Sequence, residues 1–356
     1  MPNGSGPIDT PLMYNYAFVV HSLSSLIPVG VFGASGYAGR ELCALIAGHP
    51  SLRLAFATAN AQRGTNLRVK ASGHVHDISL VATDDVQLSD AQLIFSALPH
   101  GASAEWVAKA LAAGARVVDL SSDMRPGHGG NTHALPAGVP SHPPYGLTEL
   151  FRDQIRGAQV VANPGCYATS VLIALAPLAK AGLIAKGSSI SIAAASGVSG
   201  AGASPKLELL FAEVTENFHP YAAGNSHRHL HEMRDTMSRL DADCDLVFTP
   251  HLLPVDRGIL STITVTLAHA IPDALAPFRD LYANEPFVEV TAALPALKDV
   301  ARRNVVRLHA LTPSDVRTPT LVVFSAIDNL MKGAAGQAMQ NANLMLGLDE
   351  TAGLPA

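Results

Sequence analysis

The stretch that decides the fold reads Ile27-Pro28-Val29-Gly30-Val31-Phe32-Gly33-Ala34-Ser35-Gly36-Tyr37-Ala38-Gly39. A short apolar run ends at the first of three glycines with GxxGxxG spacing, and a helical pattern follows from Glu41. Glycines in such a turn let backbone amides at a helix N-terminus approach a pyrophosphate closely. Residues 33–39 are therefore predicted to bind a dinucleotide, although a plain tight turn would have a similar composition.

The pattern around this turn predicts an α/β protein with a Rossmann-type, doubly wound parallel sheet. Strands are expected at residues 52–58, 91–97 and 115–120, with a helix at 103–113. Beyond residue 166 the pattern changes to that of an α+β domain. Helices are expected there at 172–181, 207–214 and 329–346, and strands at 189–195, 246–249, 262–268, 305–310 and 321–327.

The end of the second expected strand indicates which dinucleotide binds. It reads Thr58-Ala59-Asn60-Ala61-Gln62-Arg63 and contains no acidic residue. An NAD site usually places Asp or Glu here for the ribose 2′-hydroxyl, whereas an NADP site prefers small polar residues and an arginine. Thr58 and Arg63 are therefore predicted to contact NADP, although Arg63 could equally be a solvated loop residue.

Composition excludes several other classes of function. The 356 residues carry 24 Lys and Arg against 29 Asp and Glu, with no basic stripe, so a nucleic-acid partner is not expected. No apolar run reaches the roughly 18 to 20 residues of a membrane span. Three widely spaced cysteines, Cys43, Cys166 and Cys244, favour a reducing, cytoplasmic location and no disulfide framework or metal site. Residues 1–26 are interpreted as an N-terminal extension, because no positive charge precedes their apolar patch.

Cys166 is the candidate nucleophile. Two apolar residues and an Asn-Pro-Gly turn precede it, and a helix-compatible segment follows, which places the thiol near a helix N-terminus. Unpaired amides there favour the thiolate, which is the reactive form. The alternative is a small, buried, apolar cysteine.

A histidine cluster, Asn225-Ser226-His227-Arg228-His229-Leu230-His231-Glu232-Met233, offers a base for this thiol. Helical periodicity places His229 at the edge of the apolar face, and Glu232 follows at i+3, where it can orient the imidazole. His229 is therefore the preferred base, and His227 is the alternative if the helix begins irregularly. A metal site at His227 and His231 lacks a third ligand, and three solvated histidines are the plain alternative.

Many motifs in order resemble one family, the N-acetyl-γ-glutamyl-phosphate reductases, over residues 28–354. They are the glycine turn, Leu98-Pro99-His100-Gly101, residues 118–125 (VDLSSDMR), Tyr145-Gly146-Leu147, Asn163-Pro164-Gly165-Cys166-Tyr167, residues 196–202 (SGVSGAG), His227-Arg228-His229, residues 249–258 (TPHLLPVDRG) and residues 328–338 (DNLMKGAAGQA). The resemblance implies NADPH-dependent reduction of an acyl phosphate through a Cys166 thioester in arginine biosynthesis. It also implies a catalytic domain like that of glyceraldehyde-3-phosphate dehydrogenase and a homo-oligomer, a tetramer or a dimer.

The resemblance implies further site residues. Cofactor contacts are expected from Leu98, Pro99, Ser196, Gly197, Asn329, Lys332 and Gly333, and substrate contacts from Asn163, Arg125, Ser199, Gly200 and Arg257. Arg257 could instead be an ordinary salt-bridge residue. Relatives commonly carry a basic residue directly after the 196–202 run, whereas Ala203-Ser204-Pro205 precedes Lys206 here.

The expected domains are an extension at 1–26, an NADP-binding domain at 27–165, a catalytic and oligomerisation domain at 166–327, and a C-terminal helix at 328–356 that returns to the first domain. Two alternative functions stay open. One is a reductase of N-blocked α-aminoadipyl phosphate in lysine biosynthesis, which would use the same thiol and glycine turn. The other is an NADP-binding sensor without catalysis, which would lack the nucleophile or the base.

Overall fold

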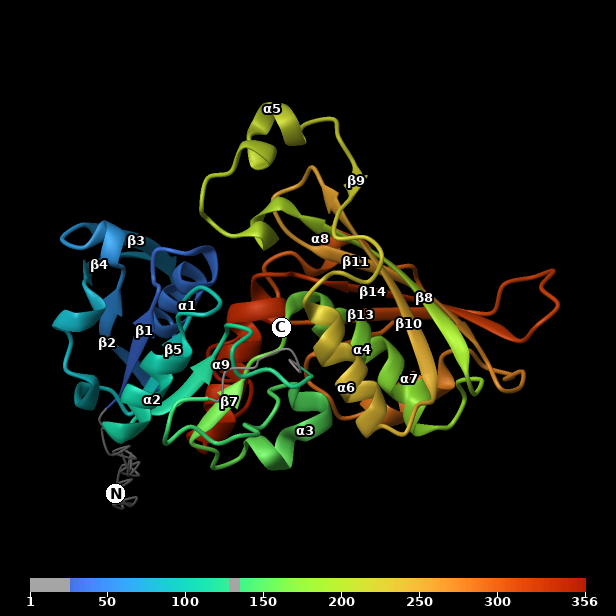
Figure 1. The fold of residues 1–356 in the computed structure, drawn as a ribbon, viewed down its shortest axis with the longest axis horizontal. Helices are drawn as coiled ribbons and strands as arrows, with labels where there is room; N and C mark the ends of the chain where they lie inside the picture. Colours follow the sequence, from blue (N-terminus) through green and yellow to red (C-terminus); the bar gives the residue numbers. More distant parts are fainter. Residues whose placement is uncertain (1–25, 128–134) are drawn as a thin grey trace, which may run out of the picture.

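The computed structural model describes residues 26–127 and 135–356, so the expected extension at 1–26 lies almost entirely outside the described residues. Two seven-stranded sheets lie side by side, each with helices packed against it (Figure 1). Among the described residues, no helix is long and apolar enough to cross a membrane.

The first sheet has the strand order β3-β4-β2-β1-β5-β6-β7. Its strands are β1 (Ile27–Phe32), β2 (Leu52–Thr58), β3 (Asn66–Ala71), β4 (His74–Val81), β5 (Leu93–Ser96), β6 (Arg116–Asp119) and β7 (Val160–Ala162). Every pairing is parallel except that of β3 with β4. The predicted parallel, doubly wound sheet is confirmed, and its edge carries an antiparallel hairpin that was not predicted.

Helices cover this sheet and fix its core. They are α1 (Tyr37–Ala47), α2 (Ala104–Ala112), α3 (Thr148–Ile155) and, from the far end of the chain, α9 (Gly336–Met345), with short 3-10 turns at Asn60–Gln62, Thr83–Asp85 and Leu88–Asp90. Side chains of α1 and α9, including Leu42, Ile46, Ala338 and Met339, share one buried cluster with Val29 of β1. The C-terminal helix therefore packs in the core of the first sheet.

The second sheet is mixed and has the order β12-β13-β14-β11-β8-β10-β9. Its strands are β8 (Ser188–Gly197), β9 (His219–Pro220), β10 (Cys244–Leu253), β11 (Ile259–Thr266), β12 (Val288–Val290), β13 (Val306–Leu311) and β14 (Thr320–Ile327). The pairs β8/β10 and β12/β13 are parallel, and the other pairs are antiparallel. The α+β prediction for this half is confirmed.

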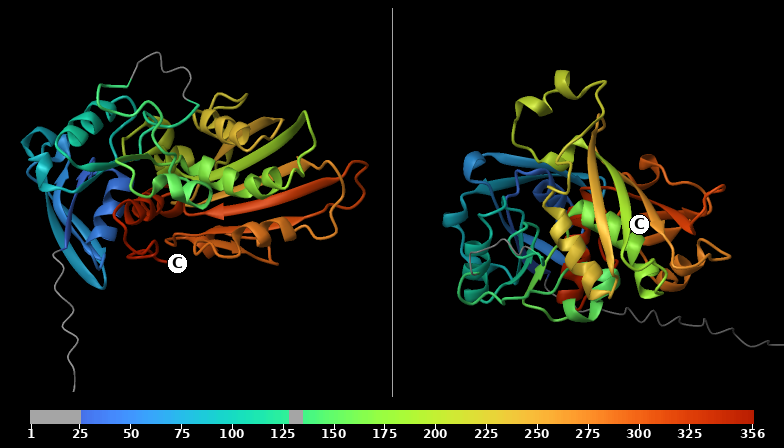
Figure 2. Two further views of the ribbon diagram at one scale, coloured as in Figure 1. Left: turned by 90° about the horizontal axis from the view of Figure 1, so that it is seen from below. Right: turned by 45° about the vertical axis from the view of Figure 1, so that its right-hand side comes forward.

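Three helices pack against one face of this sheet: α4 (Cys166–Lys180), α6 (His229–Arg239) and α7 (Ala276–Tyr282) (Figure 2). A shorter helix, α8 (Leu297–Val300), contacts β13 and β14. Helix α4 is buried along almost its whole length because it lies between the sheet and α6, which explains its continuous apolar sequence. It begins at Cys166, earlier than the expected helix at 172–181.

Two other expected helices differ from the prediction. Residues 207–214 form a 3-10 turn, Leu207–Leu209, and a single helical turn, α5 (Phe211–Val214). They belong to an arm, residues 203–218, that projects from the molecule between the two sheets (Figures 1 and 2). The helix expected at 329–346 opens with a π-helical turn, η6 (Met331–Ala335), before α9 begins.

Candidate active site

The glycine turn after β1 has one glycine for each requirement of a nucleotide-binding turn. Gly33 has φ +73°, and a Cβ there would lie 2.5 Å from the carbonyl oxygen of Ala97, so the tight turn needs glycine. A Cβ on Gly39 would overlap the Gly33 carbonyl, so helix–strand packing needs glycine there as well. At Gly36, which precedes α1, the nearest described atom lies 3.4 Å from such a Cβ. The protein's own packing therefore leaves space at the helix N-terminus, where an anionic pyrophosphate binds in such folds.

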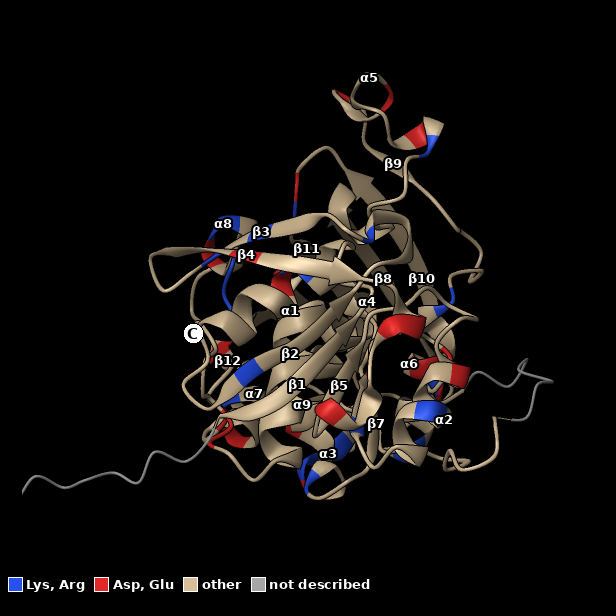
Figure 3. Cartoon of the chain, turned by 90° about the vertical axis from the view of Figure 1, so that its left-hand side faces the viewer, with Lys and Arg blue, Asp and Glu red and all other residues tan. Residues whose placement is uncertain are grey.

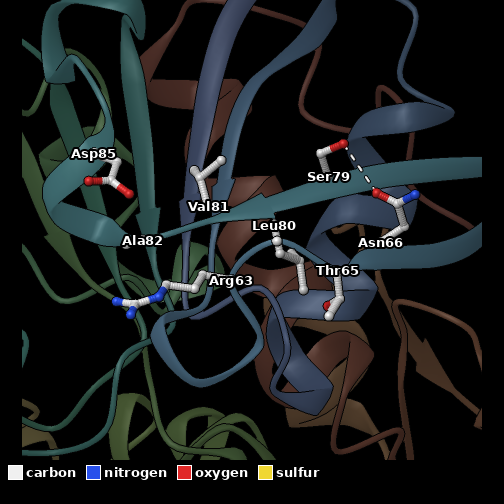
Figure 4. Close-up of a pocket in the computed structure, with 9 residues that line it drawn as sticks. Arg63, Thr65, Asn66, Ser79, Leu80, Val81, Ala82 and Asp85 are labelled. Atoms are coloured by element: carbon white, nitrogen blue, oxygen red, sulfur yellow. Dashed lines mark hydrogen bonds between the residues drawn. The ribbon is translucent and has the colours of Figure 1, made fainter.

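The end of β2 agrees only in part with the expected NADP contacts. The Thr58 side chain is fully buried and its hydroxyl accepts a hydrogen bond from Thr83 at 3.0 Å, so the contact expected from Thr58 corrects to a structural one. Arg63 is exposed and lines a pocket of about 340 Å³ (Figure 4). The rest of the lining is Gly64, Thr65, Asn66, Ser79, Leu80, Val81, Ala82 and Asp85.

The loop after β5 lies beside this turn, because β5 pairs with β1. Leu98 is half-buried and Pro99 is exposed. Asp123 holds the following residues, since its carboxylate accepts the backbone N–H groups of Gly101 at 2.8 Å and Ser103 at 3.1 Å. The loop is thus fixed at the carboxyl ends of the central strands, where ligands bind in open α/β sheets.

Cys166 is the first residue of α4, and Gly165 precedes it with extended backbone angles. Burial raises the pKa of the thiol to about 11, against the opposing effects of Arg125 and of the Tyr167 backbone amide. The expected preference for the thiolate is therefore not found, because burial outweighs the effect of the helix N-terminus. Cys166 therefore holds its proton at neutral pH and needs a base. Gly333 of η6 packs against it, since a Cβ there would lie 2.7 Å from the Cys166 Cβ.

His229 begins α6 and packs against the turn that carries Cys166. A Cβ added to Gly165 would lie 2.5 Å from His229 Nε2, so this imidazole nitrogen faces the turn. His227 has a different place: its Nδ1 accepts the backbone N–H of His229 at 3.2 Å. Burial, with Arg228 and Arg125, lowers the pKa of His227 to about 4. A neutral imidazole that holds the start of the helix is a weak candidate for the base, which favours His229.

Glu232 is buried and contacts the same turn. Its carboxylate accepts hydrogen bonds from the Gly165 backbone N–H at 3.1 Å, the Tyr145 hydroxyl at 2.7 Å and the Arg125 guanidinium at 3.3 Å. Tyr145 belongs to the Tyr145-Gly146-Leu147 motif of the family resemblance, yet it was not predicted as a site residue. Orientation of His229 by Glu232 stays a prediction.

Two residues expected at the substrate also hold the protein together. Arg125 is buried and donates to the carbonyl oxygens of Asn163 and Leu120, both at 2.8 Å, as well as to Glu232. The Asn163 side chain accepts from Asn341 of α9 at 3.0 Å and donates to the Ala334 carbonyl at 3.2 Å. Both side chains thus have partners within the protein, and their contact with the substrate stays a prediction.

Arg257 and Lys332 have ion-pair partners within the protein. Arg257 donates to Glu41 of α1 at 2.8 Å and to Asp328 at 3.4 Å, so its guanidinium links the two halves of the molecule. Lys332 is 0% exposed, and its ammonium donates to Glu149 at 2.5 Å and to Gln340 at 2.7 Å. These contacts favour the salt-bridge alternative for Arg257 and a structural role for Lys332, while the expected ligand contacts of both stay predictions.

The Asn329 side chain connects the turn at residues 196–202 with the loop at residues 255–258 by hydrogen bonds. The Asn329 side chain donates to the Ser199 hydroxyl at 3.0 Å and accepts the Gly258 N–H at 2.6 Å. The turn has three glycines; a Cβ on Gly197 would lie 2.8 Å from Arg257, and one on Gly200 would lie 2.9 Å from Ser196. Asn329, Ser196, Gly197, Ser199 and Gly200 thus form one compact loop cluster.

The π-helical turn η6 connects the two predicted sites. It packs on α1, which follows the glycine turn, and on α4, which begins at Cys166. π-Helical turns occur frequently at functional sites. The nucleotide-binding turn and the thiol are therefore held on one shared element.

Comparisons with known proteins agree with this geometry. Residues 28–158 match the family model described as the NAD binding domain of semialdehyde dehydrogenase, and residues 166–329 match its dimerisation domain. Aspartate semialdehyde dehydrogenase II of Vibrio cholerae, solved with its ligand ASA, is similar in fold (TM-score 0.72, 19% identity, covering 91% of this chain and 99% of that one). The aspartate semialdehyde dehydrogenase of Candida albicans, solved with NADP, has a TM-score of 0.67 at 14% identity, over 90% and 99% of the two chains.

The two matched domains, one that binds the dinucleotide and one for dimerisation, define a semialdehyde dehydrogenase. Proteins named N-acetyl-gamma-glutamyl-phosphate reductase are more similar in sequence. That of Rhodopirellula baltica is 42% identical over 93% of this chain and 99% of its own length, and that of Thermus thermophilus is 42% identical over 92% and 98%. The chain belongs to the N-acetyl-gamma-glutamyl-phosphate reductase family.

Proposed function

We propose that Cys166 is the nucleophile, and His229 the base, of an acyl-phosphate reductase. The observation that carries the proposal is the meeting of three parts: the thiol at the start of α4, the His229 ring against the same turn, and the η6 contact with the nucleotide-binding helix. As a family member, the chain reduces N-acetyl-γ-glutamyl phosphate to N-acetylglutamate 5-semialdehyde and phosphate with NADPH in arginine biosynthesis.

The residues present fit NADPH. The open space at Gly36 and the N-terminus of α1 suit the pyrophosphate, and the loop of Leu98 and Pro99 lies next to it. Arg63, the one cation of the pocket after β2, is the candidate for the 2′-phosphate. When bound, the cofactor supplies the hydride that reduces the thioester.

The chain's own residues supply the acid–base chemistry. Because burial raises the pKa of Cys166 to about 11, His229 takes the thiol proton as sulfur attacks the acyl carbon and phosphate leaves. The tetrahedral oxyanion formed by this attack, before phosphate leaves to give the thioester, lies at the N-terminus of α4, whose first N–H groups have no acceptor within the helix. After reduction, the same imidazole returns its proton as the aldehyde is released and the thiol re-forms.

The loop cluster of Ser196, Ser199, Gly200 and Asn329 is the proposed binding region for the substrate and the nicotinamide end of the cofactor. Its polar atoms and glycines provide donors for phosphate or carboxylate oxygens. Substrates of the lysine pathway are not favoured, because the relatives reported above carry the name of the acetylglutamyl enzyme.

Phosphate-dependent reduction of NADP⁺ with N-acetylglutamate semialdehyde tests the proposal. Cys166→Ser is expected to abolish turnover, whereas Cys244→Ser, at a half-buried cysteine on β10, should retain it. Robust turnover by Cys166→Ser would sink the covalent mechanism. A parallel assay with a blocked aminoadipyl semialdehyde should give much lower kcat/KM.

We also propose a cytoplasmic homo-oligomer, a dimer or a tetramer. The arm at residues 203–218 leaves Leu207 and Phe211 74% and 83% exposed, and it lies within the match to the dimerisation domain. In Figure 3, Lys and Arg residues are interspersed with Asp and Glu on β3, β4, α6 and α8, which suits a small-molecule enzyme better than a nucleic-acid binder. Sedimentation should show a smaller particle for Phe211→Ser but not for Val75→Ser, at another exposed apolar position.

A further inference from the structure

The turn that carries Cys166 is bound from both sides by one buried ion pair. Arg125 donates from Nε to the Asn163 carbonyl at 2.8 Å, and Glu232 accepts the Gly165 N–H at 3.1 Å. The two charged groups also meet each other, at 3.3 Å, with their side chains only 7% and 2% exposed. Both peptide groups that flank Pro164 are therefore held by the same pair.

The pair joins three separate parts of the molecule. Arg125 comes from the loop after β6, Glu232 from the first turn of α6, and the turn itself leads from β7 into α4. Tyr145 also binds the pair, since its hydroxyl donates to Glu232 at 2.7 Å. Because His229 lies one turn before Glu232 on α6, any shift of Glu232 also moves the proposed base relative to the thiol.

We propose that the Arg125–Glu232 pair is a positioning device that fixes the Cys166 turn against the His229 helix and balances the charge around the sulfur. This role is separate from the substrate contact expected of Arg125, because it needs only the contacts of the pair with the turn. The inference rests on Cys166 being the nucleophile, and it gives Glu232 a role different from the orientation of the imidazole.

The electrostatics agree with this geometry. Burial raises the pKa of Cys166, Arg125 lowers it, and Glu232 raises it again, so the two members of the pair act on the thiol with opposite sign. The other titratable or charged groups near the sulfur are Arg228, His227 and His229 at the start of α6, Tyr167 on α4 and Tyr221 after β9. Removing one member of the pair should leave the other uncompensated.

The test is alkylation of Cys166 by iodoacetamide as a function of pH, measured by mass spectrometry on the Cys166 peptide without substrate or cofactor. Glu232→Gln keeps the side-chain volume and removes the negative charge, so its alkylation profile should shift to lower pH. Arg125→Met should shift it to higher pH, and the double variant should return close to the wild-type profile. Turnover should fall at least about tenfold in all three, because a misplaced nucleophile reacts slowly.

Two further variants separate position from charge. Arg125→Lys keeps the charge but cannot reach all three acceptors, so it should leave the alkylation profile near wild type while kcat falls. Arg152→Met, which removes the ion pairs of Arg152 with Glu285 and Glu350, is the control and should change neither readout in the folded protein. Thermal unfolding of each variant identifies any chain that fails to fold.

Some results would overturn the inference. Shifts of the same sign in Glu232→Gln and Arg125→Met would do so, as would wild-type turnover by Glu232→Gln. A shift confined to the pH profile of turnover, with alkylation unchanged, would assign Glu232 to the imidazole instead. Failure of the proposed function is a separate result, because Cys166→Ser with full turnover would leave these alkylation shifts intact.

Discussion

Gly165→Ala tests the close approach of the nucleophile turn to the base. Gly165 has φ −73°, which alanine also adopts, so the substitution strains no backbone angle. The new Cβ would lie 2.5 Å from His229 Nε2 and 2.6 Å from Glu232 Oε1. The effect of the methyl group is therefore one of packing alone.

The expected size of the effect follows from these distances. Restoring an ordinary contact of about 3.4 Å requires the turn and α6 to separate by nearly 1 Å. Overpacking of this kind costs about 1 to 3 kcal/mol of stability. A displacement of about 1 Å between reacting groups lowers the rate by roughly 100-fold. We expect kcat to fall by about that factor, with a modest loss of thermal stability.

The assay compares kcat and the unfolding temperature of Gly165→Ala with those of Gly48→Ala. Gly48 ends α1 with φ −96°, and its nearest neighbour is the flexible Ser72 side chain at 3.2 Å, so alanine there should leave kcat unchanged. Wild-type kcat in a folded Gly165→Ala protein would refute the argument that this turn and His229 must remain in close contact.

Three other substitutions test individual contacts. Lys332→Met should lower the free energy of unfolding by about 3 to 5 kcal/mol, because Glu149 would keep a buried charge without its partner. The NADPH affinity of the folded variant should stay unchanged, and adding Glu149→Gln should restore stability. A large loss of NADPH affinity would instead place Lys332 at the cofactor. Gly36→Val should weaken NADPH binding, measured by fluorescence titration, by about tenfold or more. The melting temperature should change little, since a Cβ at this position has space within the protein. Unchanged NADPH affinity would argue against a pyrophosphate at this turn. Because the pKa of His227 is lowered to about 4, the unfolded chain binds the extra proton more readily, and stability should be lost as pH falls from about 6.5 towards 4. His227→Asn should flatten that part of a urea-denaturation profile, and an unaltered slope would contradict the burial of a neutral imidazole.

The sequence predicted the central elements of the fold because their patterns are local. The glycine turn, the strand after it and the helix from α1 onward depend on residues that are neighbours in the chain. The hairpin of β3 and β4 was missed although β3 alternates polar and apolar residues and buries Leu67 and Val69, whereas β4 has a less regular pattern with exposed polar residues such as Asp77.

The helix expected at 207–214 forms only in part, as a 3-10 turn and the single helical turn α5. Its apolar residues match a helical period, yet Leu207, Leu210 and Phe211 lie on an exposed arm with no core beneath them. Periodicity predicts a helix only when the apolar face has something to pack against within the same chain.

At the candidate site, too, local patterns could be predicted from the sequence and long-range contacts could not. Cys166 and His229 could be proposed from sequence, because a thiol after Asn-Pro-Gly and a histidine at a helix start are local signals. The partners of Lys332, Arg257 and Arg125 could not, since Glu149, Glu41 and Glu232 lie more than 100 residues away in the chain. Without knowledge of those partners, the charged side chains suggested ligand contacts, and the ion pairs that the fold forms could not be predicted.

The most direct test of the central claim is a burst experiment without phosphate. The protein is mixed with N-acetylglutamate semialdehyde and NADP⁺, the mixture is quenched with acid, and the peptides are analysed by mass spectrometry. We predict close to one NADPH formed per active site and an N-acetylglutamyl group on Cys166, both lost in Cys166→Ser. Continued turnover without phosphate and without an adduct, or an adduct on another residue, would contradict Cys166 as the nucleophile.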